Sequence, residues 1–210
     1  MNIALFGATG LTGPSVLKEA LARGHRVTAL ARKPEAITDK HERLRVVKGD
    51  ALTTSDVSAC LDGCEVALHC VGVGGRGDGK PNSLVSDSVA LMLPLMKERG
   101  ARRLVVMSNL WAGGSGAWGM RKIAIPLFAR WLRPILADKD RMEAFLRASE
   151  GVEWVAPRFP EIFDGPAKPL KTSADGRGIS MKISTGSIAA FMLDHLSGET
   201  YVGETPAVSN

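Results

Sequence analysis

Cysteine is scarce in this sequence, with three residues in 210 and none of the regular spacing of a disulfide framework. An odd count of this kind predicts free thiols in a reducing compartment, so we expect Cys60, Cys64 and Cys70 to be unpaired. The alternative is a metal site that these thiols form with His69. Because the spacing resembles no paired C-x-x-C, we expect no metal site.

Long apolar runs are also missing. The longest uncharged apolar run near the middle of the chain covers residues 123–129 and includes a proline, whereas a transmembrane helix needs about 20 apolar residues. This absence excludes a membrane span. Residues 2–6 already have the pattern of a strand that leads into a glycine turn, so we expect no secretory signal and a cytoplasmic protein.

The chain has no internal repeat and no shift in composition that would mark a second domain. Its 45% hydrophobic and 23% charged residues exclude a disordered or collagen-like chain. A compact chain of this length buries roughly 70% of its unfolded surface, so we expect one domain over residues 1–210. The net charge of +5 favours anionic ligands in general. It does not by itself indicate nucleic acid, which we do not expect as a partner.

Apolar runs of strand length alternate with segments of helical spacing, which predicts βαβ units around a parallel sheet. We expect an α/β fold, a single Rossmann-like doubly wound parallel sheet with a small C-terminal excursion that forms a substrate pocket. The expected strands are residues 2–6, 26–31, 44–47, 65–71, 103–107 and 152–156, with an edge strand within 201–208. The expected helices are residues 14–23, 54–61, 84–99, about 140–149 and 187–196.

Three segments interrupt this alternation. Residues 72–82 are rich in glycine, and residues 159–177 contain three prolines and two glycines. Both follow strands that end at one edge of the expected sheet, where ligands bind in open α/β folds. Residues 117–136 combine apolar, aromatic and basic side chains, which fits a lid over the pocket, a partner contact or a membrane-surface helix.

The strongest local signal is the turn between the first strand and the first helix, Gly7-Ala8-Thr9-Gly10-Leu11-Thr12-Gly13. Gly7 lets the chain turn out of the strand, Gly10 lets backbone approach a pyrophosphate, and Gly13 lets the helix pack close to the sheet. The amides and the positive end of the helix then hold the phosphates. The spacing is GxxGxxG and not the usual GxGxxG.

The end of the second strand indicates which dinucleotide binds. An acidic residue about 20 positions after the turn favours NAD, and an arginine there favours the 2′-phosphate of NADP. Arg32 and Lys33 stand nineteen and twenty residues after Gly13, and Glu35 comes two residues later. The pair suits a phosphate dianion, so we expect NADPH/NADP as cofactor.

Asp50 and Ala51 follow the third strand. There an aspartate can accept a hydrogen bond from the adenine amino group while the next amide donates to the ring. Alternatively, Asp50 caps the helix over residues 54–61.

Several stretches together resemble the atypical short-chain dehydrogenase/reductases, with the biliverdin-IXβ reductase/flavin reductase-like branch as the closest likeness. They are GATGLTG at 7–13, LARKPE at 30–35, GDALTTSDV at 49–57, VMSN at 106–109, and the segments 138–159 and 183–196. The resemblance covers nearly the whole chain. It implies NADP contacts at Gly7, Thr9, Gly10, Leu11, Thr12, Gly13, Arg32, Lys33, Asp50, Ala51, Val71, Gly72 and Val73.

Standard members of this superfamily use a tyrosine four residues before a lysine as proton donor. The only tyrosine here, Tyr201, is followed by no such lysine, and Trp118-x-x-x-Lys122 mimics the spacing without an acidic hydroxyl. The tyrosine mechanism is therefore not expected. Hydride transfer to a flavin, quinone or tetrapyrrole needs mainly positioning, with the proton taken from solvent.

Ser108 is the candidate catalytic residue, because the resembled enzymes keep a serine near the nicotinamide at this strand end. Its hydroxyl polarises the acceptor or orients the carboxamide, or else it is a buried serine bonded to backbone. Lys139 and Glu143 match a lysine–glutamate pattern of atypical members, but an ion pair on a solvated helix face is favoured. Arg158 faces either the pocket or the surface, and His69 is expected to be a satisfied interior imidazole.

We therefore expect an NADPH-dependent oxidoreductase that passes hydride to a planar conjugated acceptor. Its partner is a small-molecule electron acceptor, and the protein is a monomer or weak homodimer. The alternative is a non-catalytic NADP-binding redox sensor of the NmrA-like type, with which the absent tyrosine is compatible. An epimerase-like activity is disfavoured because proton-transfer residues are missing.

Overall fold

The centre of the protein is a parallel sheet. The computed structural model describes residues 1–73, 79–114, 127 and 129–210. Six strands are hydrogen-bonded in the order β3-β2-β1-β4-β5-β7, the doubly wound order with its switch between β1 and β4. Their bounds are β1 Asn2–Phe6, β2 Arg26–Ala31, β3 Leu44–Lys48, β4 Val66–His69, β5 Arg103–Val106 and β7 Glu153–Val155. The expected fold class is confirmed.

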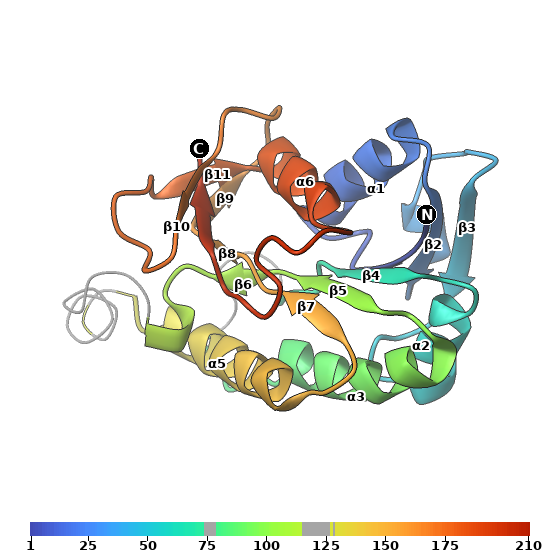
Figure 1. The fold of residues 1–210 in the computed structure, drawn as a ribbon, viewed down its shortest axis with the longest axis horizontal. Helices are drawn as coiled ribbons and strands as arrows, with labels where there is room; N and C mark the ends of the chain where they lie inside the picture. The colour runs from blue at the N-terminus through green and yellow to red at the C-terminus, as the bar shows by residue number, and fades with distance from the viewer. Residues whose placement is uncertain (74–78, 115–126, 128) are drawn as a thin grey trace.

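Helices cover both faces of this sheet (Figure 1). On one face α1 packs against α6, and on the other α3 packs between α2 and α5. Their bounds are α1 Gly13–Ala22, α2 Thr54–Leu61, α3 Leu84–Arg99, α5 Leu132–Ala148 and α6 Thr185–Asp194, with short 3-10 turns η1 Pro34–Ala36 and η2 Ala112–Gly114.

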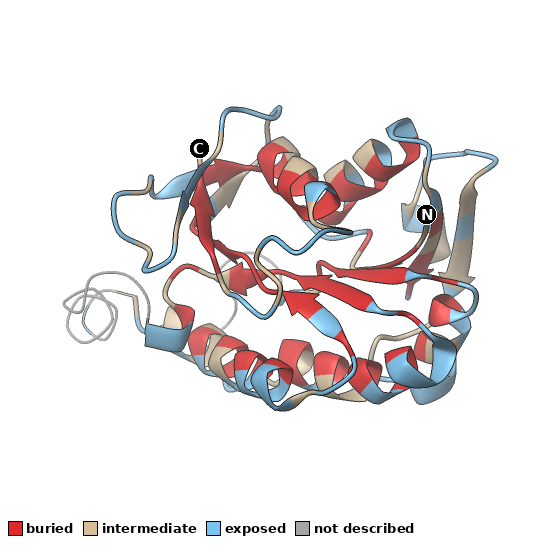
Figure 2. Ribbon diagram, viewed as in Figure 1, coloured by how far each residue is buried: buried red, intermediate tan, exposed pale blue. Residues whose placement is uncertain are grey.

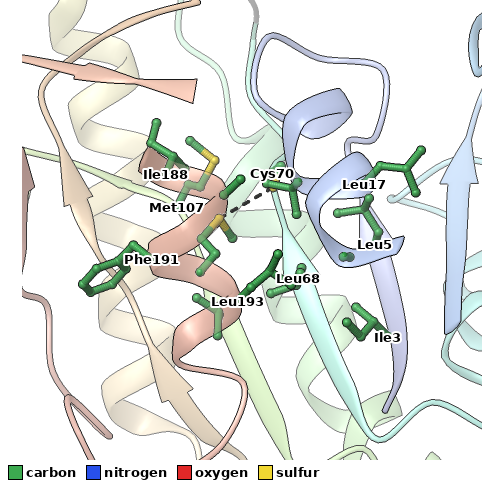
Figure 3. Packing of buried hydrophobic residues seen from close by; sticks show 14 of the residues in the cluster. Ile3, Leu5, Leu17, Leu68, Cys70, Met107, Ile188, Phe191 and Leu193 are labelled. Atoms are coloured by element: carbon green, nitrogen blue, oxygen red, sulfur yellow. Dashed lines mark hydrogen bonds between the residues drawn. The ribbon is translucent and has the colours of Figure 1, made fainter. Parts of the chain in front are cut away.

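Two hydrophobic cores lie on the two sides of the sheet. Successive side chains of a strand point to opposite faces, so Ile3 and Leu5 enter the core under α1 and α6, whereas Ala4 and Phe6 enter the core under α2, α3 and α5. Figure 3 shows the first core, where Cys70 and Met107 meet α6. Burial on both faces explains why the strands are continuously apolar in sequence (Figure 2).

Two smaller sheets follow the carboxyl ends of β5 and β7 (Figure 1). One has the order β10-β12-β8-β6 and the other pairs β11 with β9. Their bounds are β6 Ser108–Asn109, β8 Arg158–Phe159, β9 Glu161–Phe163, β10 Lys171–Ser173, β11 Lys182–Ser184 and β12 Ala207–Ser209.

These small sheets correct two expectations. Residues 159–177 are not wholly irregular, because they contain β9 and β10. The C-terminal strand is shorter than residues 201–208, and it lies between β10 and β8 and not at an edge. Strands of two or three residues carry too few side chains to show a period in sequence.

The largest difference in a helix concerns α5, which begins at Leu132, eight residues before the expected start near Asp140. Pro134 lies in its first turn, where a proline costs no hydrogen bond. Most of residues 117–136 lie outside the described part, as do residues 74–78 of the glycine-rich loop. Within the described residues, no helix has the length and apolar character needed to cross a membrane.

Candidate functional site

The turn between β1 and α1 folds back on the protein's own backbone. Gly7 has φ +85°, and a β-carbon there would lie 2.6 Å from the carbonyl carbon of Cys70. A β-carbon on Gly13 would lie 2.1 Å from the carbonyl oxygen of Gly7. At Gly10 the nearest atom would be 3.4 Å away, an ordinary contact. Gly7 and Gly13 are therefore needed by the fold, whereas Gly10 leaves space that the fold does not use.

The amides at the start of α1 are available to a ligand. Within the described residues, the amides of Leu11, Thr12 and Gly13 have no acceptor, and Thr12 at the N-cap makes no side-chain capping bond. Thr9, Gly10 and Leu11 are exposed, whereas Thr12 and Gly13 are buried. Free amides at the positive end of a helix bind phosphate oxygens, so this turn fits the expected diphosphate.

Arg32 and Lys33 follow β2 directly and are exposed. Neither side chain forms a hydrogen bond or ion pair in the described part of the chain, and Glu35, in the adjoining turn η1, forms no ion pair with them. Two unpaired cations at the end of the strand next to β1 are therefore free to meet an anion.

Asp50 forms a tight turn of its own. Its Oδ1 accepts from the amide of Leu52 at 2.9 Å, and its own amide donates to Asp56 at 2.9 Å. The N-cap of α2 is Thr53, so the alternative that Asp50 caps this helix is wrong. Asp50 and Ala51 are half-buried at the sheet edge that carries the glycine turn.

The residues after β4 border the glycine turn. A β-carbon on Gly7 would lie 2.7 Å from the amide nitrogen of Val71. Gly72 and Val73 are exposed, and a β-carbon on Gly72 would meet nothing within 4 Å. The chain after β4 therefore becomes exposed at Gly72 and Val73, directly after it passes the glycine turn.

Lys139 lies inside the protein at this edge of the sheet. Its Nζ donates to the carbonyl oxygen of Met107 at 2.7 Å, just past the end of β5. Burial lowers the pKa of Lys139 to about 8, against the nearby charges of Asp138 and Glu143. The expectation of an ion pair between Lys139 and Glu143 on a solvated helix face is wrong, because both side chains are buried and each binds a different partner.

Glu143 is instead the centre of a buried ion pair. Its Oε1 accepts from Ser108 Oγ at 2.8 Å and from Arg158 Nε at 2.9 Å, and its Oε2 accepts from Arg158 Nη2 and Arg147 Nη2. Arg158 therefore neither faces the surface nor points freely into a pocket, since 5% of it is exposed. Ser108 is buried at a strand end as one alternative held, but its hydroxyl is bonded to a carboxylate and not to backbone.

The protonation state of Glu143 follows from these contacts. Burial alone would raise the pKa of Glu143, but the hydrogen bonds and charge of Arg158, with Ser108 and Arg147, lower it overall. The group is therefore a carboxylate that accepts at both oxygens. Gly113 closes over the ion pair, because a β-carbon there would lie 2.7 Å from Glu143 Oε2 and would overlap Arg158.

Only one ring nitrogen of His69 has a hydrogen-bond partner in the described residues. The expectation of a fully hydrogen-bonded interior imidazole is therefore corrected. Its Nε2 lies 2.8 Å from Ser88 Oγ, whose proton goes to the carbonyl oxygen of Val85. Nε2 therefore carries the ring proton, and Nδ1 is a buried acceptor without a partner in the described residues. Burial, with the charge of Lys139, lowers the pKa of His69 to about 3.

Among the residues described, no tyrosine stands four positions before a lysine as a proton donor. Trp118 and Lys122 lie outside them. The buried lysine is Lys139, and the residue four positions earlier is Ile135, which has no proton to give. Tyr201 lies far along the chain and donates to Thr172.

The thiols lie in two separate places. Cys60 and Cys64 sit on and just after α2, where both donate to backbone carbonyls, and Cys70 contacts Met192. Burial raises the pKa of Cys70 to about 12. No three histidine, cysteine, aspartate or glutamate side chains come together as metal ligands in the part of the chain described.

Sequence reasoning underestimated Lys139, Glu143 and Arg158 and did not single out Gly113. The i,i+4 spacing of Lys139 and Glu143 was visible, but charged residues on a helix usually mark a solvated face. The available signal was the resemblance, which already covered residues 138–159.

Curated proteins of similar sequence cover part or most of this chain. The chain is 27% identical over 164 residues to an uncharacterised protein of Mycobacterium tuberculosis, an alignment that covers 78% of this chain and 15% of that relative. It is 32% identical over 124 residues to the divinyl chlorophyllide a 8-vinyl-reductase of Arabidopsis thaliana, with 52% and 30% covered. The chain thus spans only a minor part of these relatives.

Solved structures of similar fold cover nearly all of the chain. A protein of Bacteroides thetaiotaomicron has a TM-score of 0.83 at 23% identity, over 99% of this chain and 96% of that one. A short-chain dehydrogenase/reductase of Veillonella parvula in complex with NADP has a TM-score of 0.77 at 17% identity, with 100% and 94% covered. An anaerobilin reductase of Escherichia coli O157:H7 has a TM-score of 0.76 at 19% identity, with 100% and 97% covered.

The family assignment rests on a longer match. The sequence model of the NAD(P)H-binding family matches residues 7–199, from the first glycine of the turn to beyond α6. This range contains the turn, the basic pair after β2 and the buried group around Glu143. The chain is a member of the NAD(P)H-binding family of Rossmann-fold proteins.

Proposed function

We propose that this protein is an NADPH-dependent reductase that transfers hydride to a planar conjugated acceptor of the flavin, quinone or tetrapyrrole type. The observation that carries the proposal is the β1–α1 turn, where the amides at the start of α1 have no acceptor in the described residues and where Gly10 leaves space. Such a turn in a doubly wound sheet suits a dinucleotide. The family match supports the same cofactor class.

The choice of NADPH over NADH rests on Arg32 and Lys33. Both are exposed and unpaired in the described residues, and a guanidinium together with an ammonium group suits a 2′-phosphate. Asp50 keeps one carboxylate oxygen free beside the amide of Ala51, as contacts with adenine require. The diphosphate and the nicotinamide half would be held by Gly7, Thr9, Gly10, Leu11, Thr12, Gly13, Val71, Gly72 and Val73.

The chemistry asks little of the protein beyond positioning. When bound, the nicotinamide supplies the hydride, and a conjugated acceptor spreads the charge that develops. Ser108 and Lys139 are polar side chains at the carboxyl end of β5, at the sheet edge that also carries the glycine turn. Two similar proteins are named as reductases, of anaerobilin and of divinyl chlorophyllide a, which supports an acceptor of this type.

Turnover measurements test this proposal. The purified protein is mixed with NADPH and, without oxygen, with FMN, menadione or biliverdin, and the loss of NADPH absorbance is followed. We expect steady oxidation of NADPH with at least one acceptor and weaker activity with NADH. Tight NADPH binding without turnover of any acceptor would favour the redox-sensor alternative. Absence of binding of either dinucleotide at millimolar concentration would overturn the proposal.

A further inference from the structure

The hydroxyl of Ser108 donates its single proton to a buried carboxylate of the protein, that of Glu143. Ser108 Oγ lies 2.8 Å from Glu143 Oε1. Glu143 is wholly buried and is held as a carboxylate by Arg158 and Arg147, so it cannot donate to the serine. The proton between the two oxygens therefore belongs to Ser108.

The lone pairs of the same oxygen remain available. No donor in the described residues contacts Ser108 Oγ, and 5% of the residue stays exposed. The main chain of Ser108 is held in place as well, because its amide donates to the carbonyl oxygen of Pro157 at 2.8 Å. A ligand that reaches this residue meets a fixed oxygen that can only accept.

We propose that Ser108 acts as a hydrogen-bond acceptor toward its ligand and so selects a molecule that presents an N–H group. The proposal rests on the proposed function for the place of the ligand beside Ser108. Glu143 is then a positioning residue, which determines the polarity of the serine without touching the ligand. This removes one of the two roles expected for Ser108, since it cannot polarise a carbonyl oxygen by donation.

Several ligands of the proposed classes carry the required N–H, and a linear tetrapyrrole does so in its pyrrole and lactam groups. Two further groups can be tested with matched pairs of ligands. One is the carboxamide of the nicotinamide ring, and the other is the imide N–H of an isoalloxazine acceptor. A quinone carbonyl accepts hydrogen bonds only and gains nothing from this serine. Among the acceptors of the proposed function, we therefore expect quinones to bind less well than flavins and tetrapyrroles.

Matched ligand pairs separate the two sources. Binding constants are measured by calorimetry for NADP and its 3-acetylpyridine analogue, which lacks the carboxamide N–H. With NADP saturating, they are then measured for lumiflavin and 3-methyllumiflavin, which lacks the imide N–H. We expect the wild-type protein to prefer the N–H ligand about tenfold in one pair, the worth of one hydrogen bond.

The serine variants make the test specific. Ser108→Ala is expected to abolish that preference, and Ser108→Thr, which keeps a hydroxyl, to retain most of it. Ser173 also donates to a carboxylate, that of Asp175, but lies on an exposed strand, so Ser173→Ala serves as the matched control and is expected to change neither ratio. Equal binding within both pairs by the wild type, or an unchanged preference in Ser108→Ala, would overturn the proposal.

A reversal experiment tests the role of Glu143. In Glu143→Gln the amide oxygen can replace Oε2, which accepts from Arg158 Nη2 and Arg147 Nη2, at the loss of the single bond from Arg158 Nε to Oε1. The N–H₂ group then lies at the place of Oε1 and donates to Ser108, which frees the serine proton for the ligand. We expect the preference for the N–H ligand to fall in this variant and menadione to bind more tightly than to the wild type. A folded variant that keeps the wild-type ratios would contradict the positioning role. If the variant does not fold, the Ser108 ratios still decide the proposal.

These measurements keep the two proposals apart because they record binding and not turnover. An enzyme that oxidises NADPH but shows no N–H preference would leave the proposed function standing and overturn the inference. A protein that shows the serine-dependent preference but reduces no acceptor would leave the inference standing and overturn the proposed function.

Discussion

At the residue scale, the three glycines of the turn are required for different reasons. Gly7 and Gly13 sit so close to neighbouring backbone that any side chain would collide with it, whereas Gly10 has room for one. Gly10 tolerates a β-carbon sterically and directly precedes the amides that have no acceptor in the described residues, so we expect a ligand to occupy this space. The fold and the binding of the cofactor can therefore be separated by substitution.

Gly10→Val is expected to abolish dinucleotide binding and to change the free energy of unfolding by less than about 1 kcal/mol. Gly13→Val, with the same side chain three residues later, is expected to destabilise the fold by about 3 kcal/mol or more, because a β-carbon there overlaps the carbonyl oxygen of Gly7. Titration of NADPH and urea unfolding check both variants. Unimpaired binding by Gly10→Val would contradict the role given to the turn.

The basic pair after β2 gives a second test at this scale. Arg32→Ala is expected to weaken the binding of NADPH by about 1.5–3 kcal/mol, the contribution of a charge-assisted contact. The binding of NADH should stay nearly unchanged. Arg26, an exposed arginine at the opposite end of β2, provides the control. Calorimetry with both dinucleotides measures the difference. Equal losses for NADPH and NADH would argue against recognition of the 2′-phosphate.

At the scale of elements, α5 does more than cover the sheet. Asp138 on α5 accepts from the amides of Val85 and Ser86 and from the Ser86 hydroxyl, and so caps the start of α3 from a neighbouring helix. The same helix carries Lys139 and Glu143 into the interior. Three side chains within two turns of this charged helix thus contact α3, the end of β5 and the small sheet.

Asp138→Ala is expected to lower the free energy of unfolding by about 3 kcal/mol, because two buried amides and a hydroxyl lose a charged acceptor. Asp87→Ala is the matched control, since Asp87 is half-exposed and binds Arg141 at the surface, and its loss should cost less than about 1 kcal/mol. Urea unfolding of both variants makes the comparison. Similar losses in the two variants would show that the cap across α3 and α5 contributes little.

At the scale of the whole molecule, stability should depend on pH through buried His69. Its pKa is about 3 in the folded protein and near 6.5 when exposed. Between these values the unfolded chain binds the extra proton, so stability is lost as the pH falls below about 6.5. One such group changes the free energy of unfolding by about 1.4 kcal/mol per pH unit.

His69→Gln should therefore flatten the acid side of the stability profile. We expect the wild type to lose about 2 kcal/mol more than the variant between pH 7 and pH 5, the amount that one unprotonated imidazole contributes over this range. Urea unfolding at the two pH values measures it. Glu143 has a lowered pKa and contributes at more acid pH in both proteins, so the difference isolates His69. Parallel profiles would contradict the assignment of a neutral buried imidazole.

Much of this architecture follows from short-range patterns. The strand Asn2–Phe6, the strand Arg26–Ala31 and the helices over residues 54–61 and 84–99 have the bounds that their periodicity predicts. Their apolar spacing and the glycines that end them are local properties of the chain. The same holds for the glycine turn, because a strand, a tight turn and a helix start within a dozen residues.

The interior polar group could not be predicted in this way. Lys139 and Glu143 have the spacing of a solvated ion pair, and only the packing of α5 against α3 and β6 shows that both are buried. The partner of Glu143, Arg158, lies on a two-residue strand that has no period of its own. Contacts between residues distant in sequence depend on how whole helices and sheets pack. The sequence alone therefore determined the helices, the strands and the glycine turn, because these depend on neighbouring residues. The direction of the Ser108 hydrogen bond was decided only by the tertiary structure, because packing brings Glu143 to this hydroxyl.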